Sequence, residues 1–224
     1  MKNSNSYTRG IIKQAVAGLG VALFVSSSSF AIFDDIVTET RDVKPFETVR
    51  IAGGMQLEII VGEKQHLIVK ADEDQIADVE TIVRDGVLII GTDQDEDSWS
   101  WGEADVQVKI TVPSLKALDV RGAVDGIIKG IDAEDFVIDV RGAGKIEAKG
   151  KCVNLMVDIA GAAAVEADAL KCENVEVSLR GTGFASVYAS ESVDADLRGV
   201  GVIDISGHPK KIERDIRGIG IIND

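Results

Sequence analysis

The segment Leu118-Asp-Val-Arg-Gly122 decides the fold, because five variants of it follow in the C-terminal half of the chain. These variants end at the glycines Gly142, Gly161, Gly181, Gly199 and Gly218. Successive glycines are separated by 20, 19, 20, 18 and 19 residues. A fixed period of this length is typical of supersecondary units that stack on one another. The repeat therefore predicts stacked units, with each glycine at a bend that disfavours a Cβ atom.

Residues at fixed places before the glycines predict which side of the repeats is buried. Two and four residues before each glycine nearly all side chains are apolar, as in Val120 and Leu118 or Val140 and Ile138. Short strands that stack in register about 4.8 Å apart would bury these columns. We therefore predict an all-β fold, a parallel β-helix-like solenoid of ~20-residue rungs over 114–224. An antiparallel sandwich is the alternative, although its strands do not place the same residue in one column repeatedly.

The region 43–113 is a non-repetitive β region that precedes the repeats. Alternating apolar and polar residues in Met55-Gln-Leu-Glu-Ile59 and Val106-Gln-Val-Lys-Ile110 predict strands that bury one face. Gly53-Gly54 and Asp85-Gly86 are predicted turns between strands. The strand candidates are Phe46–Ile51, Met55–Val61, His66–Ala71, Gly86–Ile90 and Val106–Val112.

Residues 1–31 are predicted to be a secretory signal peptide. Three basic residues precede an apolar run at Ala15–Val25, and small residues stand one and three places before a cut after Ala31. A membrane anchor is the alternative, but the apolar run is short for a bilayer span. The segment 32–42 is then a short N-terminal lead. The sequence thus predicts a periplasmic or secreted protein whose mature chain has no integral membrane segment.

The charge balance limits the class of partner. The whole chain has a formal net charge of -14, and cleavage after Ala31 would leave 21 basic residues against 38 acidic ones. Such an acidic protein is repelled by nucleic acids and by anionic membrane surfaces. We therefore expect no nucleic-acid partner.

Several motifs carry a resemblance to a known family. The first half has Phe46-Glu-Thr-Val-Arg-Ile-Ala-Gly-Gly-Met-Gln-Leu-Glu-Ile59, Asp85-Gly-Val-Leu-Ile-Ile90 and Val108-Lys-Ile-Thr-Val-Pro-Ser-Leu-Lys-Ala-Leu118. The second half has Arg141-Gly-Ala-Gly144, Gly181-Thr-Gly183, Arg198-Gly-Val-Gly201 and Arg217-Gly-Ile-Gly220. Together they resemble the head GIN domain family of autotransporter adhesin heads, a domain of unknown function, over Val43 to Ile222. The resemblance implies a right-handed β-helical domain of the bacterial envelope, with no catalytic residues to carry over.

Two charged columns accompany the apolar ones. Three residues before each glycine stand Asp119, Asp139, Asp158, Ser178, Asp196 and Asp215. One residue before each glycine stand Arg121, Arg141, Ala160, Arg180, Arg198 and Arg217. These columns form either a charged stripe that binds a ligand or a solvated salt-bridge ladder that fixes the register. We favour the ladder, because exposed ion pairs commonly do little more.

An acidic segment with two tryptophans is the most unusual part of the chain outside the repeats. Asp93, Asp95 and Asp97 are weak calcium candidates, because their spacing matches only the start of a calcium loop. Trp99 and Trp101 form a candidate binding loop, since exposed aromatic rings can stack on a sugar or insert at a protein interface. The simpler alternative is a solvated hairpin tip.

The two cysteines occupy equivalent places in adjacent repeats. Cys152 and Cys172 each lie nine residues before the glycine of their repeat. Stacked residues at strand spacing are within disulfide range, and an exported protein meets an oxidising compartment. A disulfide and a pair of small buried thiols are both compatible with this pattern.

The sequence favours a binding protein over an enzyme. It has no nucleophile motif, phosphate loop or metalloprotease motif, and we expect no cofactor. We predict a non-enzymatic envelope or secreted domain with an adhesin-like role, whose partner is a surface, a glycan or a protein. One alternative is a structural module that forms a homo-oligomer through the terminal rung, Ile216–Ile222. A polysaccharide-active enzyme is the other alternative.

Overall fold

The computed structural model describes residues 36–92 and 106–224, which lie within one compact unit, Asp34–Asp224. The described residues are almost entirely β-strand, and their one helical element is the 3-10 turn η1 (Ile76–Asp78). The strands are β1 (Ile36–Thr40), β2 (Thr48–Val61), β3 (His66–Asp72), β4 (Val79–Arg84), β5 (Val87–Thr92), β6 (Gln107–Val112), β7 (Ala117–Ser206), β8 (Lys211–Ile216) and β9 (Ile219–Asn223). No helix among these residues is long and apolar enough to cross a membrane.

The prediction of a right-handed parallel β-helix-like solenoid is wrong. A β-helix pairs its strands in parallel, whereas this sheet is curled and mixes the two pairing modes. The pairs β1–β3, β3–β6 and β4–β5 are antiparallel, and β2–β5, β2–β6, β2–β7, β7–β8 and β7–β9 are parallel. One physical reason is the two-residue turn Asp85-Gly86, where both residues have positive φ (50° and 77°). A turn this tight can join only antiparallel neighbours, here β4 and β5.

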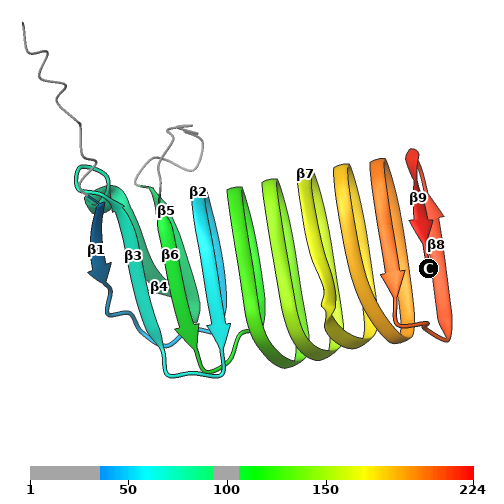
Figure 1. The fold of residues 1–224 in the computed structure, drawn as a ribbon, viewed down its shortest axis with the longest axis horizontal. Coiled ribbons are helices and arrows are strands. Elements are labelled where there is room, and N and C mark those ends of the chain that lie inside the picture. The colour runs from blue at the N-terminus through cyan, green and yellow to red at the C-terminus, as the bar shows by residue number, and fades with distance from the viewer. Residues whose placement is uncertain (1–35, 93–105) are drawn as a thin grey trace, which may run out of the picture. The chain divides into compact units, whose positions relative to one another are not determined.

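Strand β2 joins the irregular part of the sheet to the repeated part. It is continuous from Thr48 to Val61, so the turn predicted at Gly53-Gly54 is instead part of a strand. The first half of β2 pairs with β5, the second half pairs with β6, and nearly the whole strand pairs with the start of β7 on its other side. Figure 1 shows β2 between β6 and the coiled ribbon of β7.

Strand β7 contains five of the six repeats and curls through successive turns that lie side by side (Figure 1). Its glycines sit against one another from turn to turn. A Cβ atom at Gly142 would lie 2.0 Å from the carbonyl oxygen of Gly122, and one at Gly199 would lie 2.0 Å from that of Gly181. Only glycine allows this approach of two backbones. The repeating glycine is therefore required by contact between turns.

The apolar columns face inward, as predicted. Leu118, Val120 and Ile138 are at most 1 % exposed, and the equivalent residues of later turns of β7 are equally buried, whereas Ile216 of β8, in the last repeat, is 45% exposed. The buried side chains of β2, β3, β5 and β6 join the same cluster. One core thus runs from the irregular strands to the last turn, and the polar residues of every strand are left on the outer faces.

Candidate functional site

Several predicted site residues lie outside the described part of the chain. They are the cleavage site after Ala31, the weak calcium candidates Asp93, Asp95 and Asp97, and the loop residues Trp99 and Trp101. Among the described residues no group of three or more His, Cys, Asp or Glu side chains could hold a metal ion.

The Asp and Arg columns form a salt-bridge ladder on one outer face. In the regular repeats each arginine pairs with the aspartate two residues before it, and Arg141 Nη2 lies 2.9 Å from Asp139 Oδ2. The pKa of Arg141 is raised, mainly because its guanidinium donates hydrogen bonds to Asp139. On β2, Arg50 lies in the aspartate column and pairs with Asp119 at 2.7 Å. These groups are already paired, which makes the ladder a poor candidate for ligand binding.

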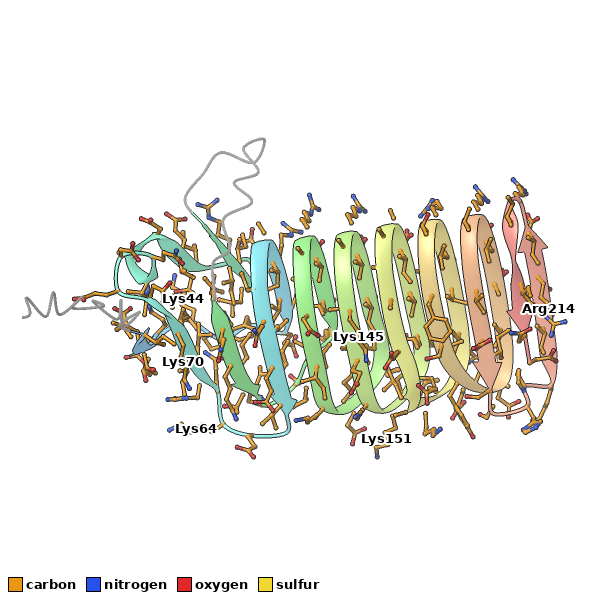
Figure 2. All side chains as sticks on the ribbon, turned by 45° about the horizontal axis from the view of Figure 1, so that its top comes forward. Lys44, Lys64, Lys70, Lys145, Lys151 and Arg214 are labelled. Carbon is orange, nitrogen blue, oxygen red and sulfur yellow. A yellow bond between two sulfur atoms is a disulfide. The ribbon has the colours of Figure 1, made fainter. Side chains whose placement is uncertain are left out.

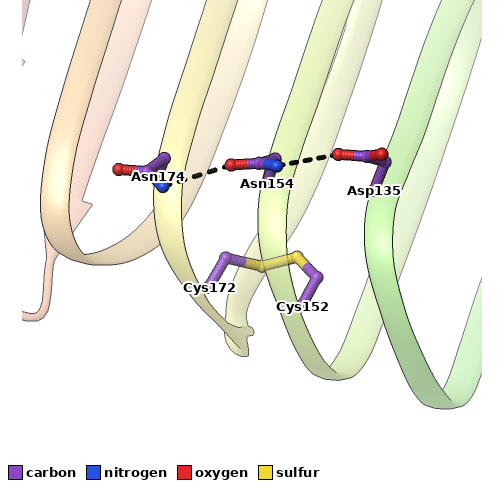
Figure 3. The surroundings of a disulfide bond; sticks show 5 residues. All are labelled: Asp135, Cys152, Asn154, Cys172 and Asn174. Atoms are coloured by element: carbon purple, nitrogen blue, oxygen red, sulfur yellow. Dashed lines mark hydrogen bonds between the residues drawn. A yellow bond between two sulfur atoms is a disulfide. The ribbon is translucent and has the colours of Figure 1, made fainter.

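Cys152 and Cys172 are bonded to each other in the structure, with a Cα–Cα distance of 4.5 Å (Figure 3). The bond links two neighbouring turns of β7 and faces the core, where both cysteines are buried. Its position inside the core suits a structural link between the two turns.

Beside the disulfide, polar side chains of adjacent turns form a second ladder (Figure 3). Asn154 Nδ2 donates to Asp135 Oδ1 at 2.8 Å, and Asn174 Nδ2 donates to Asn154 Oδ1 at 3.1 Å. The hydroxyl of Ser192 donates to Asn174 Oδ1 at 2.8 Å. These residues line an open groove of about 470 Å³. These ladder residues satisfy one another, whereas Glu176 and Asp194 of the same groove have no hydrogen bond or ion pair with another described residue.

A second groove, of about 520 Å³, contains neighbouring polar side chains that do not bond to one another. We call it the polar groove. It lies across β3, β6, β2 and the first two turns of β7. Strand register aligns the outer side chains of these strands in rows, because Lys70 is opposite Gln107, Gln107 is opposite Gln56, and Gln56 is opposite Asp125. Adjacent members of the row stand on strands about 4.8 Å apart. We call these four residues the polar row.

The polar row has no internal partners. None of its four side chains makes a hydrogen bond or an ion pair with another residue that the structure describes. Lys70, on β3, and Lys145, on β7, both line the groove and are labelled in Figure 2. Two carboxamides, a carboxylate and an ammonium are thus available to a ligand over a span of four strands.

The next row of the groove is held by ion pairs. Glu58 accepts from Lys109 at 3.0 Å and from Lys129 at 2.8 Å, and these two bonds lower the pKa of its carboxyl group. Nearby, Lys145 lies 2.9 Å from Glu166 and 3.5 Å from Glu147, and the hydrogen bond to Glu166 is the main cause of its raised pKa. These ion pairs fix the wall beside the free row.

Only part of this groove could be predicted from the sequence. The alternation in Met55-Gln-Leu-Glu-Ile59 and Val106-Gln-Val-Lys-Ile110 indicated outward Gln56 and Gln107. It did not indicate that β6 pairs with β2 in the register that places the two carboxamides side by side. That register depends on pairings between segments far apart in the chain.

Comparison with solved structures supports the fold. A putative adhesin from Bacteroides fragilis has a TM-score of 0.68 with this chain at 23% identity, covering 85% of this chain and 97% of that one. A putative lipid binding protein from Parabacteroides distasonis is less similar, with a TM-score of 0.48 and 20% identity over 84% of this chain and 96% of that one. At 23% identity the likeness to the Bacteroides fragilis protein shows a shared fold alone. No curated protein matches the sequence.

A family model extends the likeness to the sequence itself. It matches residues 45–209, which include β2 to β6, the polar row and most of the repeats. The resemblance inferred from the motifs of both halves of the chain is thereby confirmed. The chain belongs to the family described as putative auto-transporter adhesin, head GIN domain.

Proposed function

We propose that this protein is an exported, non-enzymatic binding domain that holds a hydroxyl-rich glycan of a cell surface in the polar groove. The observation that carries the proposal is the polar row, Lys70, Gln107, Gln56 and Asp125, whose side chains share one open groove without internal partners. The family description, an adhesin, supports the same class of function. The predicted signal peptide over 1–31 supports export.

The chemistry of the row suits sugar hydroxyls. Each hydroxyl both donates and accepts hydrogen bonds, and each carboxamide of Gln56 and Gln107 also does both. Lys70 adds a donor at one end of the row and Asp125 adds an acceptor at the other, so the hydroxyls of one sugar chain meet both donors and acceptors along the groove. The groove is open, and no aromatic side chain is among its described lining residues. Each contact is therefore weak, and firm adhesion would come from many copies acting together.

A glycan array tests the proposal. We expect the purified protein to bind a subset of glycans, and the Gln56→Ala/Gln107→Ala variant to lose most of that binding. Glu134→Ala/Glu173→Ala, which removes two exposed side chains away from the groove, is the matched control and should bind normally. Thermal unfolding of each variant checks that the fold is intact.

Three results would overturn the proposal. One is a groove variant that binds as well as the wild type. Another is a Trp99→Ala/Trp101→Ala variant that loses binding while the groove variant keeps it, which would move the site to the tryptophan loop. The third is absence of binding to any glycan, together with capture of a protein ligand, which would leave the adhesin class standing but reject a glycan as its ligand.

A further inference from the structure

We propose that β9 is a self-association edge, at which a second copy of this chain adds its own β9 in antiparallel orientation. This inference is independent of the polar groove. Strands β8 and β9 each pair with β7 on one side, and no strand among 36–92 and 106–224 pairs with their other side. An unpaired strand edge presents backbone donors and acceptors that a further strand can satisfy.

An apolar patch accompanies this edge. Ile219 and Ile221 of β9 are 76% and 57% exposed, and Val200, paired with Ile219 on the preceding turn, is 49% exposed. Three exposed aliphatic side chains in register on two neighbouring strands form a contiguous surface. Patches of this kind on an otherwise polar protein mark interaction sites.

The charge at this edge favours a copy of the same chain. The whole protein has a net charge of -14, which opposes association of two copies elsewhere. Strand β9 has no charged residue, and β8 carries two basic and two acidic residues, Lys211, Glu213, Arg214 and Asp215. The edge is therefore close to neutral, so two copies can approach there without like-charge repulsion.

The geometry of a two-fold pair selects a register. A two-fold axis makes a strand pair with itself in antiparallel orientation. With the axis at Ile221, the middle of β9, Ile221 faces its own equivalent and Ile219 faces Asn223 of the other copy. Residues opposite each other in an antiparallel pair point to the same side of the sheet. The two exposed patches would then merge into one buried surface.

The neighbouring strand limits the association to β9. Arg214 of β8 occupies the column that holds the buried Ala195 in the previous turn, and it pairs with Asp224. A charged residue at an inward position discourages one sheet end from stacking on another. Ile216 of β8 is also exposed, at 45%, so the outward patch of β9 is the larger apolar contact and not the sole one among the described residues.

Analytical ultracentrifugation over a wide concentration range tests the proposal. We expect the wild type to form a dimer, and Ile219→Lys/Ile221→Lys to sediment with half that mass. The matched control is Val153→Lys/Met156→Lys, which charges two exposed apolar side chains distant from β9 and should remain dimeric. A wild type that is monomeric throughout, or a dimer that survives the β9 substitutions, would overturn the proposal.

Cysteine cross-linking tests the register. Ile221→Cys should form an intermolecular disulfide on mild oxidation, because opposite residues have Cα atoms about 5 Å apart. Asn223→Cys should not, because its equivalents would lie about 13 Å apart along the strands. Cross-linking of Asn223→Cys without cross-linking of Ile221→Cys would reject the two-fold pairing at Ile221.

Discussion

Arg180 donates a hydrogen bond to Asp158 on the neighbouring turn of β7. Arginines of the regular repeats instead pair with the aspartate two residues before them, on the same turn, as Arg141 does with Asp139. The exception follows from the sequence. Asp158 is followed by Ala160 where other repeats have arginine, and Arg180 is preceded by Ser178 where they have aspartate. Asp158 and Arg180 each lack the usual partner on their own turn, so they pair with each other across two neighbouring turns. The bond raises the pKa of Arg180, and Asp158 is the largest cause.

This cross-turn pair should add little to stability. Both side chains are partly exposed, 49% for Arg180 and 29% for Asp158, so water screens their attraction. We expect a double-mutant cycle of Arg180→Ala and Asp158→Ala in urea unfolding to give a coupling of about 0.5 kcal/mol, vanishing at high salt. A coupling above about 2 kcal/mol would show that the pair holds the two turns together.

The glycine column should matter far more than the charged columns. A Cβ atom at Gly142 would meet the backbone oxygen of Gly122 at 2.0 Å, and a backbone atom of a paired strand cannot move aside. We expect Gly142→Ala to lower the free energy of unfolding by about 3 kcal/mol, measured as a lower urea midpoint. Gly54→Ala is the control, because its Cβ would have no neighbour closer than 3.9 Å, and it should change stability by less than about 0.5 kcal/mol. Equal effects of the two substitutions would contradict the contact between turns.

The repeats were the predictable part of the fold because each position reports the same local environment several times. Leu118 and Val120 could be assigned to the core from their columns, and both are fully buried. The irregular strands offered no such repetition. Gly53-Gly54 was predicted as a turn but lies inside β2, where pairing with β7 on one side keeps the chain extended. Tertiary pairing thus overrode the local preference of glycine for turns.

The repeat pattern also could not predict which strands pair in parallel and which pair antiparallel. A period near 20 residues indicates stacking, but it says nothing about strands that precede the repeats. There the hairpin at Asp85-Gly86 and the pairing of β3 with both β1 and β6 introduce antiparallel neighbours. The polar groove spans this irregular part, which explains why alternation indicated its outward residues but not their assembly.

The link between Cys152 and Cys172 gives a prediction about thiol content. We expect the native protein, alkylated without reduction, to gain no mass at cysteine, and to gain two labels after reduction and unfolding. The bond closes a loop with a sequence separation of 20, so Cys152→Ala/Cys172→Ala should lower stability by about 3 kcal/mol. A reducing agent should destabilise the wild type similarly and leave the variant unchanged. Two labels on the unreduced native protein would contradict the bond.

The ion pairs of Glu58 predict how stability depends on pH. The hydrogen bonds from Lys129 and Lys109 lower its pKa in the folded protein below the ordinary value of 4.5. The ionised form is therefore favoured by folding, and its contribution is fully present above that ordinary value. As the pH falls through the lowered pKa, Glu58 becomes protonated and the contribution is lost.

Urea unfolding at a series of pH values measures this contribution as the difference between the wild type and Glu58→Gln. We expect a difference in favour of the wild type at neutral pH that shrinks once the pH drops below 4.5. Glu80→Gln is the matched control, because Glu80 is exposed on β4 and has no ion pair with another described residue. Its difference from the wild type should stay small and constant over the same range. If the Glu58→Gln difference instead grew on acidification, the carboxyl group would be stabilised by folding in its protonated form, and the two lysines could not be its dominant partners.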